Sequence, residues 1–173
     1  MPYVFHGTIQ FHKKLWNKWI KDICQLNKYR VSRSFKSHLV ESAELHVFCD
    51  GSETAYGACA YIKFNHENNC CSSILVSSKS RLTPLNNSTL KTIPRIELSS
   101  AKLAVDLAHK LKRELGYEFI SETFYTDSTT VLKYINNDNA RFQRFVANKV
   151  TYIRCNVNSN QVFLFFSEFD RLF

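Results

Sequence analysis

The sequence predicts an α/β fold in which a mixed sheet carries packed helices and is preceded by an N-terminal amphipathic helix. Three short apolar runs lie close together between residues 45 and 77, which predicts three antiparallel strands in a meander. A long amphipathic pattern and a fourth apolar run follow. This order predicts a helix that crosses over and returns the chain to the same sheet, giving crossover strands beside the meander.

The composition is that of one globular domain, or of one domain with a short extra segment. The chain has 173 residues, of which 45% are hydrophobic and 14% aromatic, with only 4 glycines and 3 prolines. These proportions exclude collagen-like and linker-rich chains and argue against general disorder. No apolar run approaches the ~20 residues of a membrane span, and the start of the chain does not resemble a signal peptide.

The charge balance favours a polyanionic partner. Lys and Arg number 23 against 15 Asp and Glu, which gives a formal net charge of +8. Contacts with phosphates release condensed counterions, so a basic excess favours nucleic-acid binding, although many basic proteins use the same excess only to stay in solution. The 6 cysteines include no CxxC pair, and the adjacent Cys70 and Cys71 have poor geometry for a disulfide. We therefore expect six reduced thiols and no zinc site.

Residues 1–42 form a separate N-terminal segment in this interpretation. From residue 10 to residue 29, apolar side chains recur at helical spacing with lysines between them, which predicts an amphipathic helix. Docking of this helix on a neighbouring protein surface is favoured over a membrane-surface role. Residues 32–42 are polar and predict a linker. Residues 43–173 are expected to form the main domain.

The elements of the main domain follow from apolar runs and their boundaries. Strands are expected at residues 45–49, 55–64, 71–77 and 120–126, and residues 79–92 are expected to form a loop. Pro94 stands near the first position of a long helix that ends at Gly116, a plausible C-cap. Asp127 or Ser128 is expected to cap the next helix. Residues 142–153 predict another helix, and a final apolar run covers residues 162–166.

Three carboxylates occupy positions that suit a metal-dependent site. Asp50 and Asp127 each follow an apolar strand, and the carboxyl ends of strands are where ligands gather in α/β sheets. Glu97 stands in the first turn of the long helix, where the helix dipole favours an ionised carboxylate. A cluster of carboxylates suits Mg²⁺, and two such ions can activate water for attack at phosphorus. Each residue also has a structural explanation, as an N-cap, a turn residue or a helix-start acid.

Five motifs, in order along the chain, resemble those of the ribonuclease H-like domains of BEL/Pao-type retrotransposon polyproteins, a family also labelled Pao retrotransposon peptidase. The resemblance covers roughly residues 10–155 and includes the helix around Trp16 and Trp19, which is similar to the segment linking reverse transcriptase to this domain. The motifs lie at residues 45–58 (LHVFCDGS to AYGA), 78–85 (SKSRLTPL), 93–98 (IPRIEL), 124–128 (FYTDS) and 145–150 (FVANKV).

This resemblance implies a ribonuclease H-like mixed sheet and a metal-dependent endonuclease-type activity that hydrolyses the RNA strand of RNA–DNA hybrids. It implies that Asp50, Glu97 and Asp127 are catalytic residues that bind two Mg²⁺ ions, for which Mn²⁺ is an alternative. The implied partners are an RNA–DNA hybrid and the reverse transcriptase portion of the same polyprotein, with no membrane. The implied location is intracellular, in the cytoplasm or a retroelement particle. The residues expected to bind nucleic acid are Ser52, Lys79, Arg81, Arg95 and Ser128, and the alternative for the three cations is that they are ordinary solvated surface charges.

The C-terminal part departs from the family pattern. Ribonuclease H-like sites usually have a fourth acidic residue after the last strand, which this family offers in an Asn-Pro-Ala-Asp-like stretch. Asp170 is the only nearby aspartate and nothing around it resembles that motif, so the domain is expected to be C-terminally truncated or divergent. A catalytically dead nucleic-acid-binding remnant is therefore an alternative. An aspartic peptidase is a weaker one, because Asp50-Gly51-Ser52 has the wrong residue order and no second copy exists.

Overall fold

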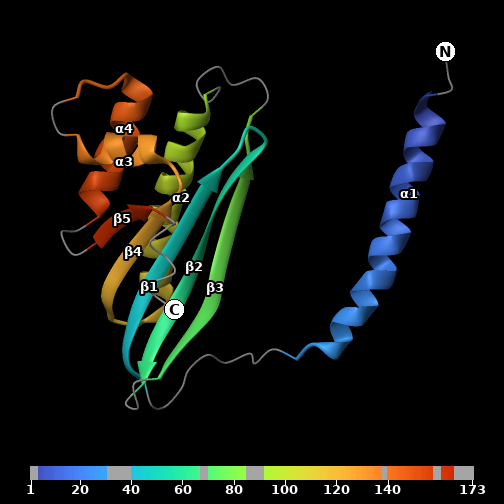
Figure 1. The fold of residues 1–173 in the computed structure, drawn as a ribbon, viewed down its shortest axis with the longest axis horizontal. Coiled ribbons are helices and arrows are strands. Elements are labelled where there is room, and N and C mark those ends of the chain that lie inside the picture. The colour runs from blue at the N-terminus through green and yellow to red at the C-terminus, as the bar shows by residue number, and fades with distance from the viewer. Residues whose placement is uncertain are drawn as a thin grey trace. The chain divides into compact units, whose positions relative to one another are not determined.

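The computed structural model describes residues 4–30, 40–66, 70–84, 92–137, 140–157 and 161–165. The chain divides into two compact units, Met1–Lys36 and Ser37–Phe173. The second unit contains the sheet and three helices that alternate with its later strands along the chain (Figure 1). None of the helices in the described ranges is long and apolar enough to cross a membrane.

The N-terminal unit is a helix, as the spacing of apolar residues predicts. Helix α1 (Val4–Ile23) continues into a short 3-10 helix, η1 (Cys24–Lys28). The helix begins earlier than expected, at Val4 instead of residue 10. Side chains from residue 12 to residue 30 are all exposed, including Trp16 and Trp19, whose rings lie 5.0 Å apart. The apolar face of α1 is therefore uncovered within its own unit.

The sheet of the second unit is mixed and has five strands in the order β3-β2-β1-β4-β5 (Figure 1). The first three strands form an antiparallel meander, and β4 then pairs parallel with β1 and β5 parallel with β4. The predicted α/β fold, with a meander and crossover strands, is confirmed. The strands are β1 (Val40–Gly51), β2 (Ala55–His66), β3 (Cys71–Leu82), β4 (Phe119–Thr126) and β5 (Gln161–Phe165).

Two strand boundaries differ from the sequence prediction. Strand β1 begins at Val40, inside the stretch that was expected to be linker, and β3 continues to Leu82, into residues expected to form a loop. The end of β3 is polar because β3 is an edge strand with mostly exposed side chains. It is held by backbone pairing with β2, down to the pair Ala55 and Leu82. Residues 85–91 of the expected loop lie outside the described residues.

Three helices complete the unit: α2 (Ile93–Leu115), α3 (Thr129–Asn136) and α4 (Arg144–Asn156). Pro94 lies in the first turn of α2, and Gly116 ends the helix in the left-handed region with φ 63°, so both predicted boundaries are confirmed. Of the two candidate caps of α3, Ser128 is the one used, because its Oγ accepts a hydrogen bond from Val131 N at 3.1 Å.

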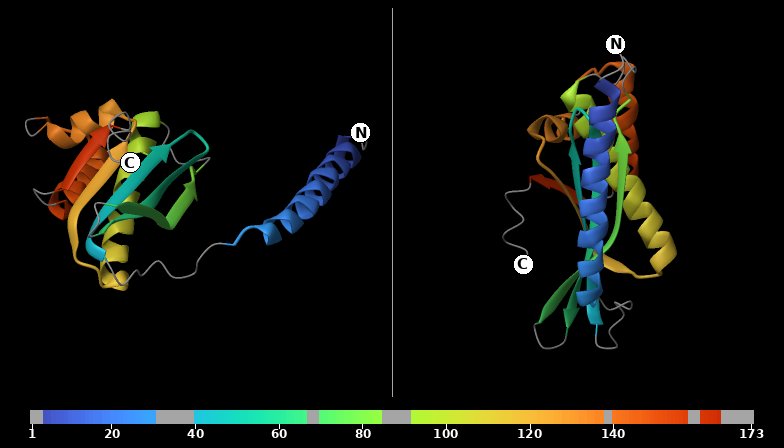
Figure 2. Two further views of the ribbon diagram at one scale, coloured as in Figure 1. Left: turned by 60° about the horizontal axis from the view of Figure 1, so that its bottom comes forward. Right: turned by 90° about the vertical axis from the view of Figure 1, so that its right-hand side faces the viewer.

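The core lies between the sheet and α2, which packs across β1 and β2, while α4 packs against α2 (Figure 2). Alternate residues of β1 are buried on the side of α2, so the residues between them lie on the opposite face of the sheet. All six cysteines are free, as expected. Fully buried side chains of this core include Leu45, Val47, Ile62, Phe64, Leu98, Ala104 and Val105.

Candidate active site at the ends of strands β1 and β4

Asp50 and Asp127 leave the sheet at the same edge. Strands β1 and β4 are parallel neighbours in which Cys49 pairs with Thr126, so each aspartate directly follows one member of that pair. Both aspartates are exposed. Burial and the negative charge of Asp50 together raise the pKa of Asp127 above its ordinary value. The two carboxylates are therefore close enough to repel each other, and a bound cation would relieve that repulsion.

Glu97 lies against both strand ends, through one contact on each side. A Cβ atom added at Gly51 would lie 3.1 Å from Glu97 N and 3.0 Å from Ile96 Cγ2. Glycine suits this close approach between the end of β1 and the first turn of α2, because a Cβ here would displace its neighbours by a few tenths of an ångström. On the other side, Ser128 Oγ donates a hydrogen bond of 2.6 Å to Glu97 Oε2. The structure thus brings the first turn of α2 next to the residues that follow Asp50 and Asp127.

The carboxylates are held by donors of the protein itself. Asp50 Oδ1 accepts a hydrogen bond from Gly51 N at 2.6 Å, and Glu97 accepts one from Ser128. In the described ranges, no three His, Cys, Asp or Glu side chains are gathered into a group that could hold a metal ion. The donor chemistry nevertheless fits a hard divalent cation, because all three side chains offer carboxylate oxygens and two of them repel each other.

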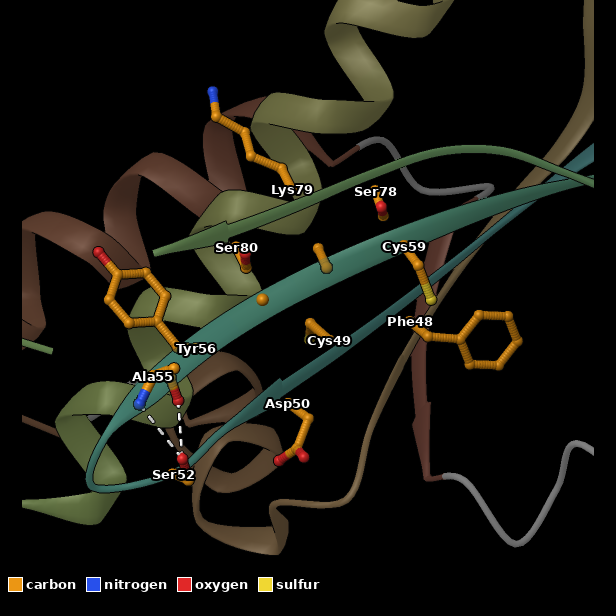
Figure 3. A pocket seen from close by; sticks show the side chains of 12 residues that line it. Phe48, Cys49, Asp50, Ser52, Ala55, Tyr56, Cys59, Ser78, Lys79 and Ser80 are labelled. Atoms are coloured by element: carbon orange, nitrogen blue, oxygen red, sulfur yellow. Dashed lines mark hydrogen bonds between the residues drawn. The ribbon is translucent and has the colours of Figure 1, made fainter. Parts of the chain in front are cut away.

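Ser52 shapes the turn that follows Asp50. Its Oγ donates to Ala55 O at 3.0 Å and accepts from Ala55 N at 3.3 Å, while Ser52 N donates to the same carbonyl at 2.8 Å (Figure 3). Thr83 N donates to Thr54 O at 2.9 Å, which ties the end of β3 to this turn. Ser52 therefore fixes the chain next to the candidate site.

An open groove of ≈ 510 Å³ lies beside Asp50, across strands β1, β2 and β3. In the strand register, Gly57 pairs with both Asp50 and Ser80, so the row that contains Asp50 continues with two small residues. Sequence reasoning missed Gly57 and Ser80. The alternating pattern of β2 could have indicated that Gly57 shares the face of Asp50, but no sequence signal gives the partner on β3.

The cations expected to bind nucleic acid are divided between two places. Lys79 pairs with Ala58, which in turn pairs with the core residue Cys49, so Lys79 belongs to the face covered by α2. Figure 3 shows its ammonium group pointing away from Asp50. Arg81 lies two residues further along the same face. Arg95 lies elsewhere, in the first turn of α2, where its guanidinium donates a hydrogen bond to Gln143.

Ser128 has a second function that sequence reasoning did not foresee. It was expected to cap a helix and to contact nucleic acid, but its hydroxyl also holds Glu97. One hydroxyl accepts from the backbone of α3 and donates to a carboxylate of the candidate site. The residues after position 165, including Asp170, lie outside the described part of the chain.

This topology, with two aspartates at the ends of adjacent parallel strands and a glutamate at the start of the crossover helix, is that of a ribonuclease H-like domain. Residues 9–128 match the model of the family described as Pao retrotransposon-like RNaseH-like domain, and the chain belongs to this family. It is therefore a ribonuclease H-like domain of retrotransposon type.

Solved structures with similar folds include RNase H1 from the halophilic archaeon Halobacterium salinarum, with 12% identity, coverage of 70% of this chain and 84% of that chain, and a TM-score of 0.45. A foamy viral protease–reverse transcriptase in complex with dsDNA has 12% identity over 88% of this chain and 29% of that chain, with a TM-score of 0.46. An RNase H1 in complex with an RNA/DNA hybrid has 10% identity over 72% and 84%, with a TM-score of 0.36. No curated protein matched the sequence.

Proposed function

We propose that this domain hydrolyses the RNA strand of RNA–DNA hybrids, using divalent cations held by Asp50, Glu97 and Asp127. The proposal rests on one observation: two aspartates at the ends of adjacent strands meet the first turn of α2, with Gly51 and Ser128 as the points of contact. Family membership supports the same activity. Mg²⁺ is the expected ion, because it prefers oxygen ligands, and Mn²⁺ is the alternative.

Each residue of the site has a separate task in this proposal. Asp50 and Asp127 supply negative charge at the strand ends, and Glu97 supplies the third carboxylate from the first turn of α2. Cations bound there would supply an activated water and stabilise the charge that develops on the phosphodiester. Ser128 positions Glu97 and keeps the start of α3 in place.

The groove beside Asp50 is the proposed seat of the hybrid. Its row of small residues, Gly57 and Ser80, leaves space for a backbone to approach Asp50, and Ser52 lies at one end of the groove. Hybrids are recognised through shape, phosphates and 2′-hydroxyls, which suits small polar side chains and a net charge of +8. Arg95, in the first turn of α2, and Ser128, which is hydrogen-bonded to Glu97, are the further residues proposed to contact the hybrid.

The polyprotein context is part of the proposal. We propose that residues 1–42 are the end of a connection to a reverse transcriptase portion and that residues 43–173 are the nuclease domain. The exposed apolar side chains of α1 support a protein partner for this helix. The expected place of action is the cytoplasm or a retroelement particle inside the cell.

The test is cleavage of an end-labelled RNA annealed to DNA by the full chain in Mg²⁺. The Asp50→Asn variant removes one charge at constant volume and should cleave at least about 100-fold more slowly, since even outer-shell partners of metal sites contribute about 10–100-fold. Asp22→Asn, on exposed α1, is the matched control and should leave the rate unchanged.

Two outcomes would contradict the proposal. Equal cleavage rates for the wild type and Asp50→Asn would show that the proposed carboxylate site does not carry out the reaction. A wild-type protein that binds the hybrid but releases no product in Mg²⁺ or Mn²⁺ would instead support the alternative of a catalytically dead nucleic-acid-binding remnant.

A further inference from the structure

Four cations from three elements gather on the side of the sheet that carries the helices. They are called here the helix-side cations: Lys79 and Arg81 of β3, Lys102 of α2 and Lys149 of α4. Lys102 Nζ lies 2.8 and 2.9 Å from the two carboxylate oxygens of Asp106. The charge of Lys79 acts on the same carboxylate, and the charges of Lys102 and Arg81 act on Lys149. The four side chains therefore form one electrostatic group.

Positive charge in this group exceeds negative charge. Asp106 is fully engaged, because it also accepts a hydrogen bond of 2.8 Å from Tyr152 Oη. Over the described ranges, Lys79, Arg81 and Lys149 take part in no ion pair within 4.0 Å, whereas Lys102 is paired with Asp106. Among the described residues, these three cations thus have no carboxylate partner of their own.

Aromatic rings hold two of these cations in place. Lys102 Nζ lies 4.1 Å from the centroid of Tyr152, and Lys149 Nζ lies 5.0 Å from that of Phe145. Such contacts restrict long side chains that would otherwise move apart. Burial and the charge of Lys102 lower the pKa of Lys149, an effect that Asp106 offsets in part and Arg81 reinforces. Keeping like charges together in this way costs free energy, and a bound anion would offset that cost by reducing the repulsion between them.

The helix-side cations are connected to the candidate active site through Arg95. The Arg95 guanidinium carbon lies 5.6 Å from the centroid of Phe145, the ring that Lys149 also contacts. Arg95 is two residues before Glu97. Positive charge is therefore continuous from the first turn of α2 to α4, whereas the row of Asp50, Gly57 and Ser80 lies on the other face of the sheet.

We propose that the helix-side cations bind the phosphate backbone of a nucleic-acid strand at a distance from the bond that is cleaved. A phosphodiester backbone fits because it offers several negative charges along an extended chain, as a row of cations from β3 to α4 requires. The proposal rests on the proposed function for the identity of the nucleic acid, an RNA–DNA hybrid. It assigns these residues to affinity and position, not to the chemistry.

The test is hybrid binding in the Asp50→Asn background, measured by fluorescence anisotropy over a range of salt concentrations. The triple variant Lys79→Gln, Arg81→Gln and Lys149→Gln keeps the pair of Lys102 with Asp106. It should bind more weakly and reduce the salt slope by about one for each phosphate that is no longer neutralised. The matched control carries Lys28→Gln, Lys110→Gln and Arg113→Gln, three exposed cations with the same charge change, and should retain the parent affinity and slope.

Equal affinities and slopes for the two triple variants would overturn the proposal, as would the absence of hybrid binding by the parent. Thermal unfolding of each variant identifies a loss of folding. Binding is measured without cleavage, so this test is independent of the outcome for the proposed function. If the wild-type protein cleaves hybrids, the same three substitutions in the wild-type chain should raise KM and leave kcat unchanged.

Discussion

The substitution Gly51→Ala tests the closest approach in the candidate site. Its new methyl group would lie 3.0 Å from Ile96 Cγ2, 3.1 Å from Glu97 N and 3.2 Å from Ile96 C, where ordinary contact begins at 3.4 Å. Two of these atoms belong to the backbone, so the end of β1 and the first turn of α2 must separate by at least 3.4 − 3.1 = 0.3 Å. Overpacking of this kind costs about 1–3 kcal/mol of folding free energy.

The position of Glu97 relative to Asp50 should change with this separation. We expect Gly51→Ala to weaken Mg²⁺ binding and to slow hybrid cleavage by about 10–100-fold, as removal of a supporting residue does at metal sites. The assay combines urea unfolding with Mg²⁺ titration of cleavage at a temperature where the variant remains folded.

Gly116→Ala is the matched control. Gly116 has φ 63° and nothing within 4 Å of an added Cβ, so alanine there costs roughly 1 kcal/mol of backbone strain far from the carboxylates. The control should lose stability and keep its Mg²⁺ dependence. If both variants cleave at the wild-type rate with the same Mg²⁺ requirement, the contact between β1 and α2 does not position Glu97.

Three further predictions concern the site and the core. Ser128→Ala removes the cap of α3 and the donor to Glu97, so it should cost about 1 kcal/mol in thermal unfolding and slow hybrid cleavage; an unchanged rate would contradict the positioning of Glu97. Burial lowers the pKa of His46 below 6.5 despite the opposing charge of Glu44, so the unfolded chain takes up protons first. The contribution of neutral His46 to the unfolding free energy should therefore be fully present above about pH 6.5 and decrease below it. Urea unfolding at pH 7.5 and 5.5 should show a smaller decrease for His46→Asn than for the wild type. Equal pH dependence of the two proteins would refute this. Ile62→Ala, at a fully buried site, should cost about 2–5 kcal/mol, whereas Ile120→Ala, 63% exposed, should change the unfolding free energy by less than about 0.5 kcal/mol.

The order of elements could be predicted because each boundary has a local cause. Pro94 favours the first turn of a helix, Gly116 supplies the left-handed residue at its end, and the hydroxyl of Ser128 accepts a hydrogen bond from one backbone donor of α3. The extension of β3 could not be predicted in this way. An edge strand with mostly exposed side chains needs no apolar alternation, so its polar end resembled a loop although its backbone pairs with β2.

The arrangement of the candidate site could also be predicted only in part from the sequence. Strand-end positions predict that Asp50 and Asp127 lie at one edge, because carboxyl ends of neighbouring parallel strands coincide. The close approach of Glu97 depends on the absence of a side chain at Gly51. Gly51 belongs to one of the sequence motifs, but the motif alone does not show which part of the chain it contacts. The hydrogen bond from Ser128 to Glu97 joins residues 31 positions apart and has no local signal.

The side on which Lys79 lies depends on one irregularity in the sheet. Ile74 pairs with the core residue Ile62, and an uninterrupted alternation from Ile74 would put Lys79 on the other face, with Asp50. The register shifts between Ala60 and Tyr61, where one extra residue of β3 is accommodated, and every later side chain of β3 changes face. This shift brings Lys79 beside Ala58 on the helix side and leaves small side chains next to Asp50. A single bulge therefore opens the groove and also assembles the helix-side cations, which links the proposed cleavage site to the proposed second binding surface.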